Sequence, residues 1–455
     1  MISFIFSIFV ILLVFLFSGS LASVVFSVLT ISVGGILSLF VKPQYRKSSF
    51  SLFCIVFSVY TLLALLHYLD YTHYGNYFVP DEYGSFMPWA NYLGGLENYS
   101  EVCKVLTQEV SPNGYYFYKL PFRGYLFYIG SIEYLANHYL GGSNYLLMFQ
   151  SSVIWGSITT FPIYRLMSLR NPRSKAYYYT LIFLLLTPIC CYSHYFLRDI
   201  VIASVYAFVI YFATKKTTII GIISILVSAF IIYFVRPANA YFIGIILIYY
   251  IYKANKNNMF LLSIGILLSL IIIGASIADT TKEIQQSIEN YDNFSQESLK
   301  NQENTGAASF VWALPSPFSE ILMTLNILIH PFPTVSFNDP MINVFRFITI
   351  NLLPFVYSYI WFVVGFSLCM WTYQRKFKHI PSDYTILLWI CILFEYMNTH
   401  NIAARRVMAV FPYFFFVYAL MRERIVSKQE MIKTTKQALI IYSIIALFFI
   451  VRMII

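Results

Sequence analysis

Long apolar stretches recur from one end of this 455-residue chain to the other. Each is about 20 residues long, the length that an α-helix needs to cross the hydrocarbon core of a bilayer. Hydrophobic residues make up 59% of the sequence and charged residues 11%, so polar surface is too scarce for a water-soluble domain. In lipid, helices and closed barrels satisfy every backbone hydrogen bond. The sequence therefore predicts an all-α protein, a polytopic transmembrane helical bundle.

About thirteen transmembrane helices are expected from these stretches. They cover residues 2–18, 21–41, 50–69, 144–168, 176–195, 199–213, 218–235, 238–252, 259–277, 347–371, 383–398, 406–421 and 437–453. Two long polar segments separate them into groups. The chain is predicted to consist of three N-terminal helices (1–69), a first external loop (70–143), six helices (144–277), a second external loop (278–346) and four C-terminal helices (347–455).

Both external loops are expected to carry short helices that lie in the membrane interface. In the first loop, residues 84–98 and 124–140 fit this description. Residues 124–140 are apolar but carry Glu133, which makes an interfacial helix more favourable than a span. Residues 99–123 between them are polar and rich in turn formers. In the second loop, the apolar run 315–333 is bracketed by prolines and too short to span. It is predicted to be re-entrant or interfacial.

The basic residues indicate which side of the membrane each loop occupies. With the N-terminus in the cytoplasm, most of the 30 lysines and arginines fall in short inner connections such as KPQYRK, RNPRSK and QRKFK. Cytoplasmic loops carry such an excess of Lys and Arg. Most of the 20 carboxylates then fall on the outer side. Acid–base chemistry is therefore expected at the outer face.

Two adjacent carboxylates stand out in the first external loop, in VPDEYGSFMPWANY. Asp81 and Glu82 follow Pro80, shortly after the third predicted span. A carboxylate partly desolvated by neighbouring aromatic side chains has a raised pKa and can act as a general base toward a sugar hydroxyl. The alternative is that both are solvated loop acids, one of them capping the helix that follows.

Arginines gather at the predicted outer ends of several helices: Arg198, Arg236, Arg405 and Arg406. Guanidinium groups near lipid are costly unless paired, and their forked donors match phosphate or diphosphate. Four such residues at one membrane face favour an anion site. The alternatives are an ion pair of Arg198 with Asp199, contacts with lipid headgroups, or snorkelling at the interface.

Four further residues could support such a site. His330 and His400 lie on the same predicted side, where either could orient a phosphate or carry a proton. Glu395 sits within a predicted span, and an intramembrane carboxylate is a functional candidate. Its structural alternative is pairing with one of the two arginines that begin the next span. Arg123, ahead of the second interfacial helix, is a further supporting candidate.

Nucleic acid and a structural metal are not indicated. The net charge is +10, but the basic residues form short clusters between apolar runs rather than one soluble basic face. The six cysteines are scattered without metal-ligand spacing or a disulfide framework. No cofactor is predicted with certainty. A divalent metal stays open, because Asp81 and Glu82 could supply oxygen ligands.

The segment PDEYGSFMPWANYLGG resembles the acidic motif in the first loop of GT-C-type glycosyltransferases. These polytopic enzymes take sugars from polyprenyl-phosphate carriers. The FLRDI segment and the late apolar run that ends in PFP are similar to segments of bacterial membrane proteins from surface-polysaccharide loci. Oligosaccharide repeat-unit polymerases of O-antigen pathways look similar as well, with many spans, two sizeable periplasmic loops and external arginines.

This resemblance implies an inverting glycosyltransferase in the bacterial inner membrane, acting on the periplasmic face. Asp81 or Glu82 would activate an acceptor hydroxyl or bind a metal on the donor phosphate. The four arginines would hold the phosphate or diphosphate of a polyprenyl-linked glycan and stabilise it as leaving group. Other polysaccharide assembly proteins are potential partners.

Other functions remain open on the sequence. A repeat-unit polymerase belongs to the same class and would use the same residues. A transporter or flippase of lipid-linked glycans would instead require charged residues along a path through the bilayer and broken helices near its midplane. A structural scaffold of a polysaccharide assembly complex would leave the external charges without a role.

Overall fold

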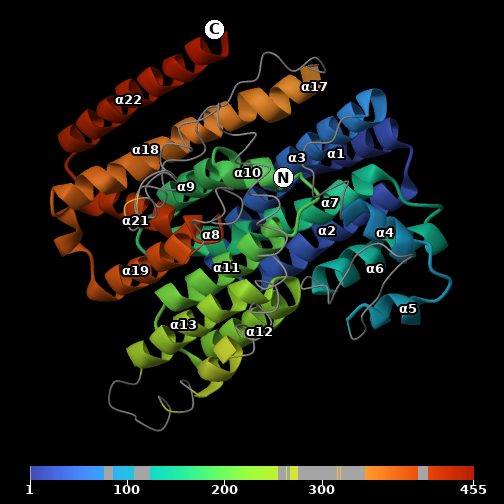
Figure 1. Ribbon diagram of the computed structural model, residues 1–455, viewed down its shortest axis with the longest axis horizontal. Coiled ribbons are helices and arrows are strands. Elements are labelled where there is room, and N and C mark those ends of the chain that lie inside the picture. Colours follow the sequence, from blue (N-terminus) through green and yellow to red (C-terminus); the bar gives the residue numbers. More distant parts are fainter. Residues whose placement is uncertain are drawn as a thin grey trace.

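The computed structural model describes residues 2–75, 86–106, 123–254, 263, 267–274, 315, 318, 344–397 and 408–454. All regular structure in these residues is helical (Figure 1). The N-terminal helices are α1 (Ile2–Ser18), α2 (Leu21–Leu39) and α3 (Pro43–Tyr74). Three helices follow in the predicted first external loop: α4 (Met87–Gly94), α5 (Tyr99–Lys104) and α6 (Arg123–Tyr139).

The middle of the chain forms a second group of helices. These are α7 (Tyr145–Ile158), α8 (Thr160–Met167), α9 (Arg173–Leu185), α10 (Pro188–Tyr192), α11 (Asp199–Thr214), α12 (Ile219–Val235) and α13 (Pro237–Ala254). The C-terminal group comprises α17 (Val344–Arg346), the π-helix η2 (Phe347–Leu352), α18 (Leu353–Tyr373), the 3-10 helix η3 (Lys376–His379), α19 (Ser382–Met397), α21 (Phe411–Arg424) and α22 (Lys428–Ile454).

Four helical stretches are long and apolar enough to cross a membrane, judged by length and composition. They are Leu21–Leu39, Pro43–Tyr74, Tyr145–Met167 and Val344–Tyr373. Helices α1, α11 and α12 are apolar but shorter. The described chain is therefore all-helical with several candidate membrane spans, as the apolar stretches predict. The count of about thirteen stays a prediction.

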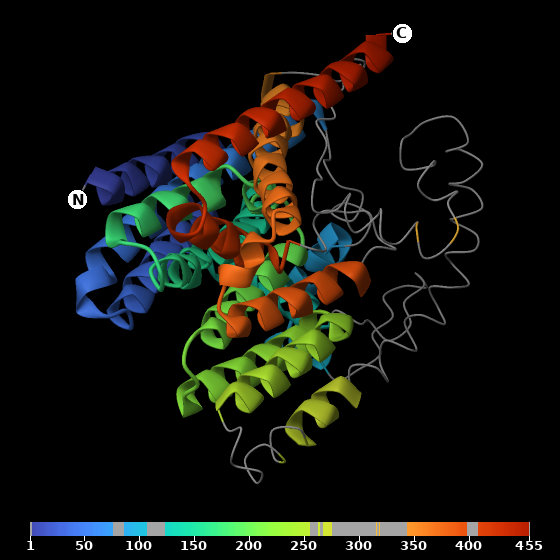
Figure 2. The same ribbon diagram turned by 90° about the vertical axis from the view of Figure 1, so that its left-hand side faces the viewer.

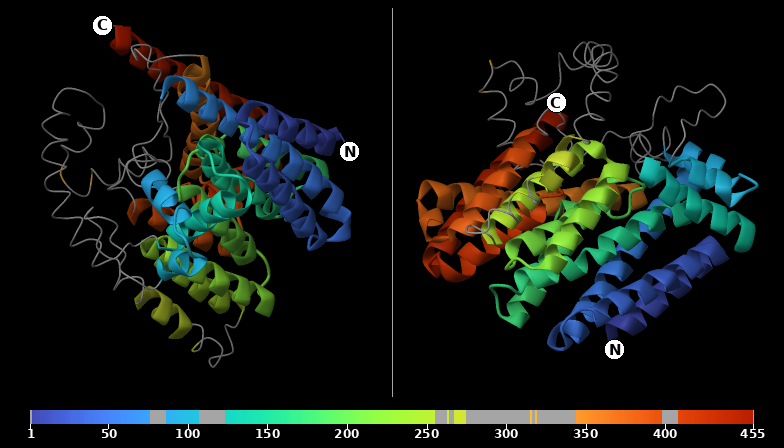
Figure 3. Two further views of the ribbon diagram at one scale, coloured as in Figure 1. Left: turned by 90° about the vertical axis from the view of Figure 1, so that its right-hand side faces the viewer. Right: turned by 90° about the horizontal axis from the view of Figure 1, so that it is seen from below.

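Helix α11 lies at the centre of the bundle. It is buried along almost its whole length and packs against α7, α8, α12, α13 and α19. Helices α12 and α13, which follow it in the chain, lie side by side next to it (Figure 3, right). Helix α22 packs on the outside of α18 through a small separate cluster that includes Phe362, Val363 and Tyr442 (Figure 2).

The helices that form differ from several predicted spans, and two of these differences have a clear local cause. The span expected at 50–69 is the middle of α3, which starts at Pro43 and ends where Gly75 adopts a left-handed conformation with φ 67°. The span expected at 176–195 is broken into α9 and α10. Pro188 has no backbone N–H and disfavours helical backbone at the preceding residue, and Thr187 is accordingly extended.

The short basic connections meet at one end of the bundle, which we call the basic end. Ion pairs there join Lys175 to Glu423, Lys376 to Glu430 at 2.9 Å, and Lys253 to Asp383 at 4.0 Å. Arg173 also donates from Nε to Ser48 at 3.0 Å, and Arg424 from Nε to the Arg170 carbonyl at 3.0 Å. Connections far apart in sequence therefore face the same side, in agreement with the predicted grouping of loops.

Helices α4, α5 and α6 lie together at one side of the bundle (Figure 1). The interfacial helices predicted at 84–98 and 124–140 correspond to α4 and α6, whereas α5 occupies part of a segment expected to be irregular. Helices α4 and α6 approach closely because each helix has a glycine opposite a side chain of the other helix. A Cβ on Gly130 would lie 2.8 Å from Leu93 Cβ, and one on Gly94 would lie 2.7 Å from Glu133 Cβ.

Gly130→Ala is expected to destabilise the α4–α6 contact. The added methyl group has no room beside Leu93, and overpacking of this kind costs about 1–3 kcal/mol. The measurement is the apparent free energy of unfolding of the detergent-solubilised protein. Gly95→Ala is the matched control, since the nearest atom to its added Cβ is 3.4 Å away. Equal stability of the two variants would contradict the close approach.

Candidate functional site

The break after α9 determines where the first charged residues of the candidate site lie. The chain between α10 and α11 is buried from Ser193 to Leu197 and delivers Arg198 directly before the first turn of α11. Asp199 occupies that first turn, where the positive end of the helix dipole favours a carboxylate. The end of α11 opposite the basic end thus presents a guanidinium and a carboxylate side by side.

Asp199 forms an ion pair with Arg236 rather than depending on its sequence neighbour. Arg236 Nη1 lies 3.6 Å from Asp199 Oδ1, and their side chains are 12% and 9% exposed. Arg236 is an extended residue between α12 and α13, and Pro237 begins the next helix. The pair therefore joins three helix ends. Neither partner could be buried alone without a large desolvation cost.

An aromatic cluster connects this charged group to the external helices. Phe86 packs edge-on against Tyr125 of α6 at 5.0 Å between ring centroids, and against Phe196 at 6.2 Å. Phe196 lies two residues before Arg198, and Tyr125 lies two residues after Arg123. Arg123 itself donates from Nη1 to the Leu106 carbonyl at 3.2 Å. The supporting residue Arg123 is therefore on the same side as the arginine pair.

An apolar cavity of about 410 Å³ lies between α6, α7, α11 and α12. It is lined by Leu106, Gly124, Tyr125, Phe127, Tyr128, Trp155, Val201, Phe230, Ile231, Phe234 and Val235. Three of these are chain neighbours of the charged residues: Gly124 follows Arg123, Val235 precedes Arg236, and Val201 is two residues after Asp199. Phe230 is 66% exposed, so the lining reaches the surface. An apolar space thus adjoins charged groups.

Buried polar residues near the outer end of α3 were not singled out from the sequence. His67 and Asp70 are both buried, one helical turn apart. The His67 ring stacks on Phe149 at 4.0 Å, and its Nδ1 lies 3.3 Å from the carbonyl oxygen of His194, which is also buried. Ionisable residues inside an apolar helix are a functional signal. That signal was available in the HYLD segment.

Glu395 is fully buried in α19, as its position in a predicted span suggests. Its neighbour Phe394 packs against Tyr206 of α11 and Phe242 of α13. Within the described part of the chain no group donates a hydrogen bond to its carboxylate. The sequence alternative of a pair with Arg405 or Arg406 involves residues outside the described ranges.

Six predicted site residues lie outside the described residues: Asp81, Glu82, His330, His400, Arg405 and Arg406. Their convergence with Arg198 and Arg236 stays a prediction. Among the residues that the structure does describe, no group of three or more His, Cys, Asp or Glu could hold a metal ion. A metal at the acidic pair is likewise still a prediction.

Glu133 on α6 is a second buried carboxylate, 1% exposed beneath α4. No residue of the described ranges donates a hydrogen bond of normal geometry to it. Burial raises the pKa of Glu133 to about 7, and the nearby Ser143 side chain opposes this with a smaller lowering effect. Near neutral pH this carboxyl group is therefore only partly ionised.

No family model, curated protein or solved structure matches the chain. Function must therefore be argued from the chemistry of the site itself.

Arg236→Gln is expected to lower the free energy of unfolding by about 3–5 kcal/mol, because it leaves the Asp199 carboxylate buried without its cation. The double variant Asp199→Asn/Arg236→Gln is expected to cost less than the sum of the two single changes. A denaturation series on the four proteins gives this coupling. Lys376→Gln breaks a partly exposed surface pair and should change stability by about 1 kcal/mol or less. Additive effects at positions 199 and 236 would show that the pair is not coupled.

The stability of the α4–α6 unit is expected to fall as pH rises from about 4.5 to 7. The folded pKa of Glu133 lies above its ordinary value of 4.5, so its protonated form favours folding below 4.5 and that contribution is lost up to about 7. The whole shift corresponds to about 3 kcal/mol. Glu133→Gln should flatten the pH dependence of the melting temperature, while Glu97→Gln, at an exposed position, should not. An unchanged pH profile in Glu133→Gln would contradict this assignment.

Proposed function

We propose that this protein is an integral membrane glycosyltransferase that uses a polyprenyl-phosphate-linked or polyprenyl-diphosphate-linked sugar or oligosaccharide as donor. It would act on the periplasmic face of a bacterial inner membrane, in the biosynthesis of an O-antigen-like surface polysaccharide. The observation that carries the proposal is the position of the Arg198–Asp199–Arg236 group, in which Asp199 is buried, beside the apolar cavity between α6, α7, α11 and α12. A phosphate carried by a lipid requires cations for its charged head and an apolar space for the chain attached to it.

The charged group fits the head of such a donor. Among the described residues it brings two guanidiniums and one carboxylate to the start of α11. Guanidinium donors match phosphate oxygens in geometry and charge. Low exposure of the pair also means that an anion bound there would be little screened by water. Arg123, at the start of α6, adds a further positive charge near the same cavity.

The apolar cavity fits the part of the donor next to its head. Its lining is almost entirely aromatic and aliphatic, and it reaches the surface at Phe230. An apolar chain there would exchange contacts with lipid tails for contacts with equally apolar side chains, so entering the cavity carries no desolvation cost. The isoprenoid units nearest the phosphate would lie in this cavity, and the remainder would extend into lipid.

The acidic pair is close in sequence to the aromatic cluster beside Arg198. Glu82 precedes Phe86 by four residues and Asp81 precedes it by five, and Phe86 is packed against Phe196. This short separation in the chain supports the proposal that the acidic pair acts together with Arg198.

The proposed reaction is a single displacement at the anomeric carbon. An acceptor hydroxyl attacks that carbon, its proton passes to Asp81 or Glu82, and the bond from the carbon to the carrier phosphate breaks. The phosphate leaves with the bonding electron pair, and the arginines stabilise the charge that develops on its oxygen. Attack opposite the leaving group inverts the configuration at the sugar.

The membrane arrangement that we propose has about thirteen spans and a cytoplasmic N-terminus. The ion pairs that gather the basic connections at one end of the bundle support it, because positive charge marks the cytoplasmic side. The arginine group lies at the other end of α11 and would face the periplasm.

A flippase or transporter of lipid-linked glycans is the second candidate. The buried carboxylate of Glu395 and the break between α9 and α10 favour it, since intramembrane charge and broken helices are typical of transport paths. Translocation of a labelled lipid-linked glycan by the purified protein in vesicles, without new glycosidic bonds, would establish this function instead.

One of the two single variants, Asp81→Asn or Glu82→Gln, is expected to reduce sugar transfer at least about 100-fold, because it removes the general base. The double variant is expected to show the same loss. Transfer is measured in membranes with a radiolabelled polyprenyl-linked donor, at matched protein levels. Glu97→Gln removes an exposed acid from the same loop and should keep full activity. Normal product in the double variant would refute the proposal.

A separate experiment distinguishes a single-sugar transferase from a repeat-unit polymerase. Deletion of the gene followed by sizing of the lipid-linked glycan gives the answer. Glycan that lacks one sugar indicates single-sugar transfer, and glycan that stops at one repeat unit indicates polymerisation.

A further inference from the structure

A second cavity, of about 630 Å³, lies at the basic end of the bundle. We call it the basic cavity. It is lined by Leu169, Arg170, Thr214, Lys215, Lys216, Thr217, Lys253, Pro381, Asp383 and Tyr384. These residues come from four separate parts of the chain: the segment after α8, the connection between α11 and α12, the end of α13 and the start of α19. It lies at the opposite end of α11 from the Asp199–Arg236 pair.

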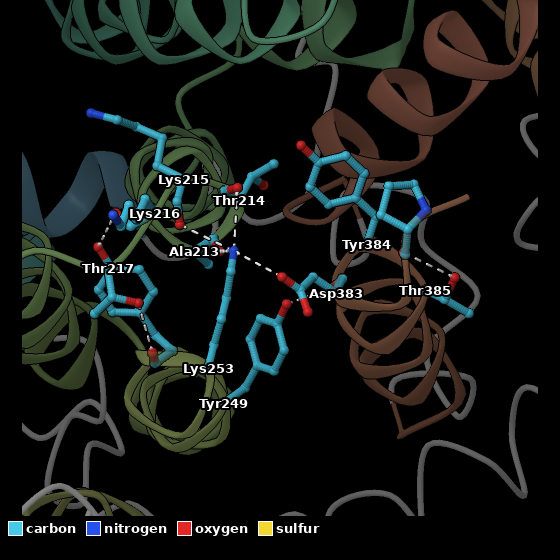
Figure 4. A network of polar contacts seen from close by, with 12 residues as sticks. Ala213, Thr214, Lys215, Lys216, Thr217, Tyr249, Lys253, Asp383, Tyr384 and Thr385 are labelled. Carbon is cyan, nitrogen blue, oxygen red and sulfur yellow. Dashed lines mark hydrogen bonds and ion pairs between the residues drawn. The ribbon is translucent and has the colours of Figure 1, made fainter. Parts of the chain in front are cut away.

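The walls of the basic cavity are fixed by contacts that do not need a ligand. Figure 4 shows the Lys253 ammonium between the end of α11 and Asp383. It donates to the carbonyl oxygens of Ala213, Thr214 and Lys215 at 3.1 to 3.4 Å. Lys253 thereby satisfies carbonyl groups that the end of a helix leaves unpaired. The connection between α11 and α12 is held against α13 in a defined position.

The opposite wall is fixed in the same way. Tyr249 of α13 donates its hydroxyl hydrogen to the Asp383 carbonyl at 2.5 Å. Arg170 donates from Nε to the Tyr384 hydroxyl at 2.8 Å, and its guanidinium lies 5.2 Å from the centre of that ring. Arg170 and the start of α19 are therefore held together. A ligand that entered would meet Arg170 and Tyr384 in a preformed arrangement.

The charges of this cavity do not balance. Its four cations face one carboxylate, Asp383, which is already near Lys253 at 4.0 Å. Arg170, Lys215 and Lys216 have no carboxylate partner within the described part of the chain. The neighbouring acids of the basic end are taken by other lysines, Glu423 by Lys175 and Glu430 by Lys376. The described acids of the basic end therefore leave these three cations without a neutralising partner.

The positive region continues into an adjoining cavity of about 400 Å³. Arg170, Pro381 and Tyr384 line both cavities, and the second also includes His379 and Arg424. Arg424 is fixed there by hydrogen bonds to the Arg170 carbonyl at 2.6 and 3.0 Å. Together the two cavities form a basic strip around Tyr384, and an anion with more than one charged oxygen could contact several cations at once.

The position of the cavity identifies the source of the anion. Lys215 places its ammonium 4.9 Å from the centre of the Tyr211 ring and 5.8 Å from that of Phe212, at the end of an apolar helix. Tyrosine, lysine and arginine at helix ends are typical of the level of the lipid headgroups. Basic pockets between helices at this level bind anionic headgroups.

We propose that the basic cavity binds the phosphate group of an anionic phospholipid in the leaflet at the basic end. Arg170, Lys215 and Lys216 contact the phosphate oxygens, and Tyr384 with its neighbours positions Arg170. The site is independent of the glycosyltransferase proposal, because it lies at the other end of α11 and uses none of the same residues.

The test uses the full-length protein in neutral detergent, with native mass spectrometry and a lipid titration as readouts. The probes are phosphatidylglycerol, phosphatidylcholine and inorganic phosphate. Wild-type protein is expected to retain phosphatidylglycerol and not phosphatidylcholine. The triple variant Arg170→Gln/Lys215→Gln/Lys216→Gln should bind phosphatidylglycerol at least about 20-fold more weakly, since each charge near an anionic lipid contributes about a factor of five.

Two further variants make the result specific. Lys42→Gln/Arg46→Gln/Lys47→Gln removes the same charge from the same end of the bundle outside the cavity, and should change binding less than about twofold. Arg170→Lys/Lys215→Arg/Lys216→Arg keeps the charge and should restore most of the affinity. If the triple glutamine variant does not fold, Lys215→Gln/Lys216→Gln carries the test, with a loss of at least about fivefold expected.

Three results would overturn the proposal. One is unchanged phosphatidylglycerol binding in the folded glutamine variant. Another is an equal loss in the control at positions 42, 46 and 47, which would indicate diffuse surface charge. The third is inorganic phosphate that binds through Arg170, Lys215 and Lys216 while phosphatidylglycerol is not retained, which would assign the cavity to a soluble phosphate.

Discussion

The ion pair between Asp199 and Arg236 is the interaction on which the arrangement of the central helices depends. It fixes the start of α11 against the junction of α12 and α13, and both side chains are nearly buried. A charge in such a place is stable only with a partner, because desolvation of either group alone would cost several kcal/mol. Val201 and Val235 are close in sequence to the two partners and line the apolar cavity, so the cavity adjoins the pair.

The sequence predicts the helices well where the argument is local. Apolar stretches become helices because each helix satisfies its own backbone groups in lipid. Charge also predicts which connections lie together, and the pair Lys175–Glu423 joins residues 248 positions apart at the basic end. The break at Thr187 could have been anticipated from Pro188, yet hydropathy alone continued the span through it. A hydropathy value is an average over a window of residues, so it does not change when one proline removes a backbone N–H from the helix.

The site was harder to predict because it depends on pairing across helices. Arg198 and Asp199 are adjacent in sequence, which favoured a pair between them, but Arg236 is the observed partner of Asp199. His67 and Asp70 carried a visible signal, polar residues one turn apart in an apolar helix, whereas the contact of His67 with His194 required the tertiary fold. Asp81 and Glu82 lie outside the described residues, so their part in the site still rests on the sequence and on the anchored Phe86.

Both ends of α11 are charged and yet sheltered, because neighbouring helices begin or end beside them. Its 16 residues rise about 24 Å, less than the roughly 30 Å of a bilayer's hydrocarbon core. Helices α12 and α13, which pack on α11, have 17 and 18 residues, and Arg236 at their junction pairs with Asp199 at its start. Lys253, in the last turn of α13, donates to the last carbonyls of α11 at its other end. A carboxylate at the start and an ammonium at the end each complement the helix dipole. Charge at a helix end can therefore be sheltered by protein rather than face lipid, which is the condition that both proposed anion sites require.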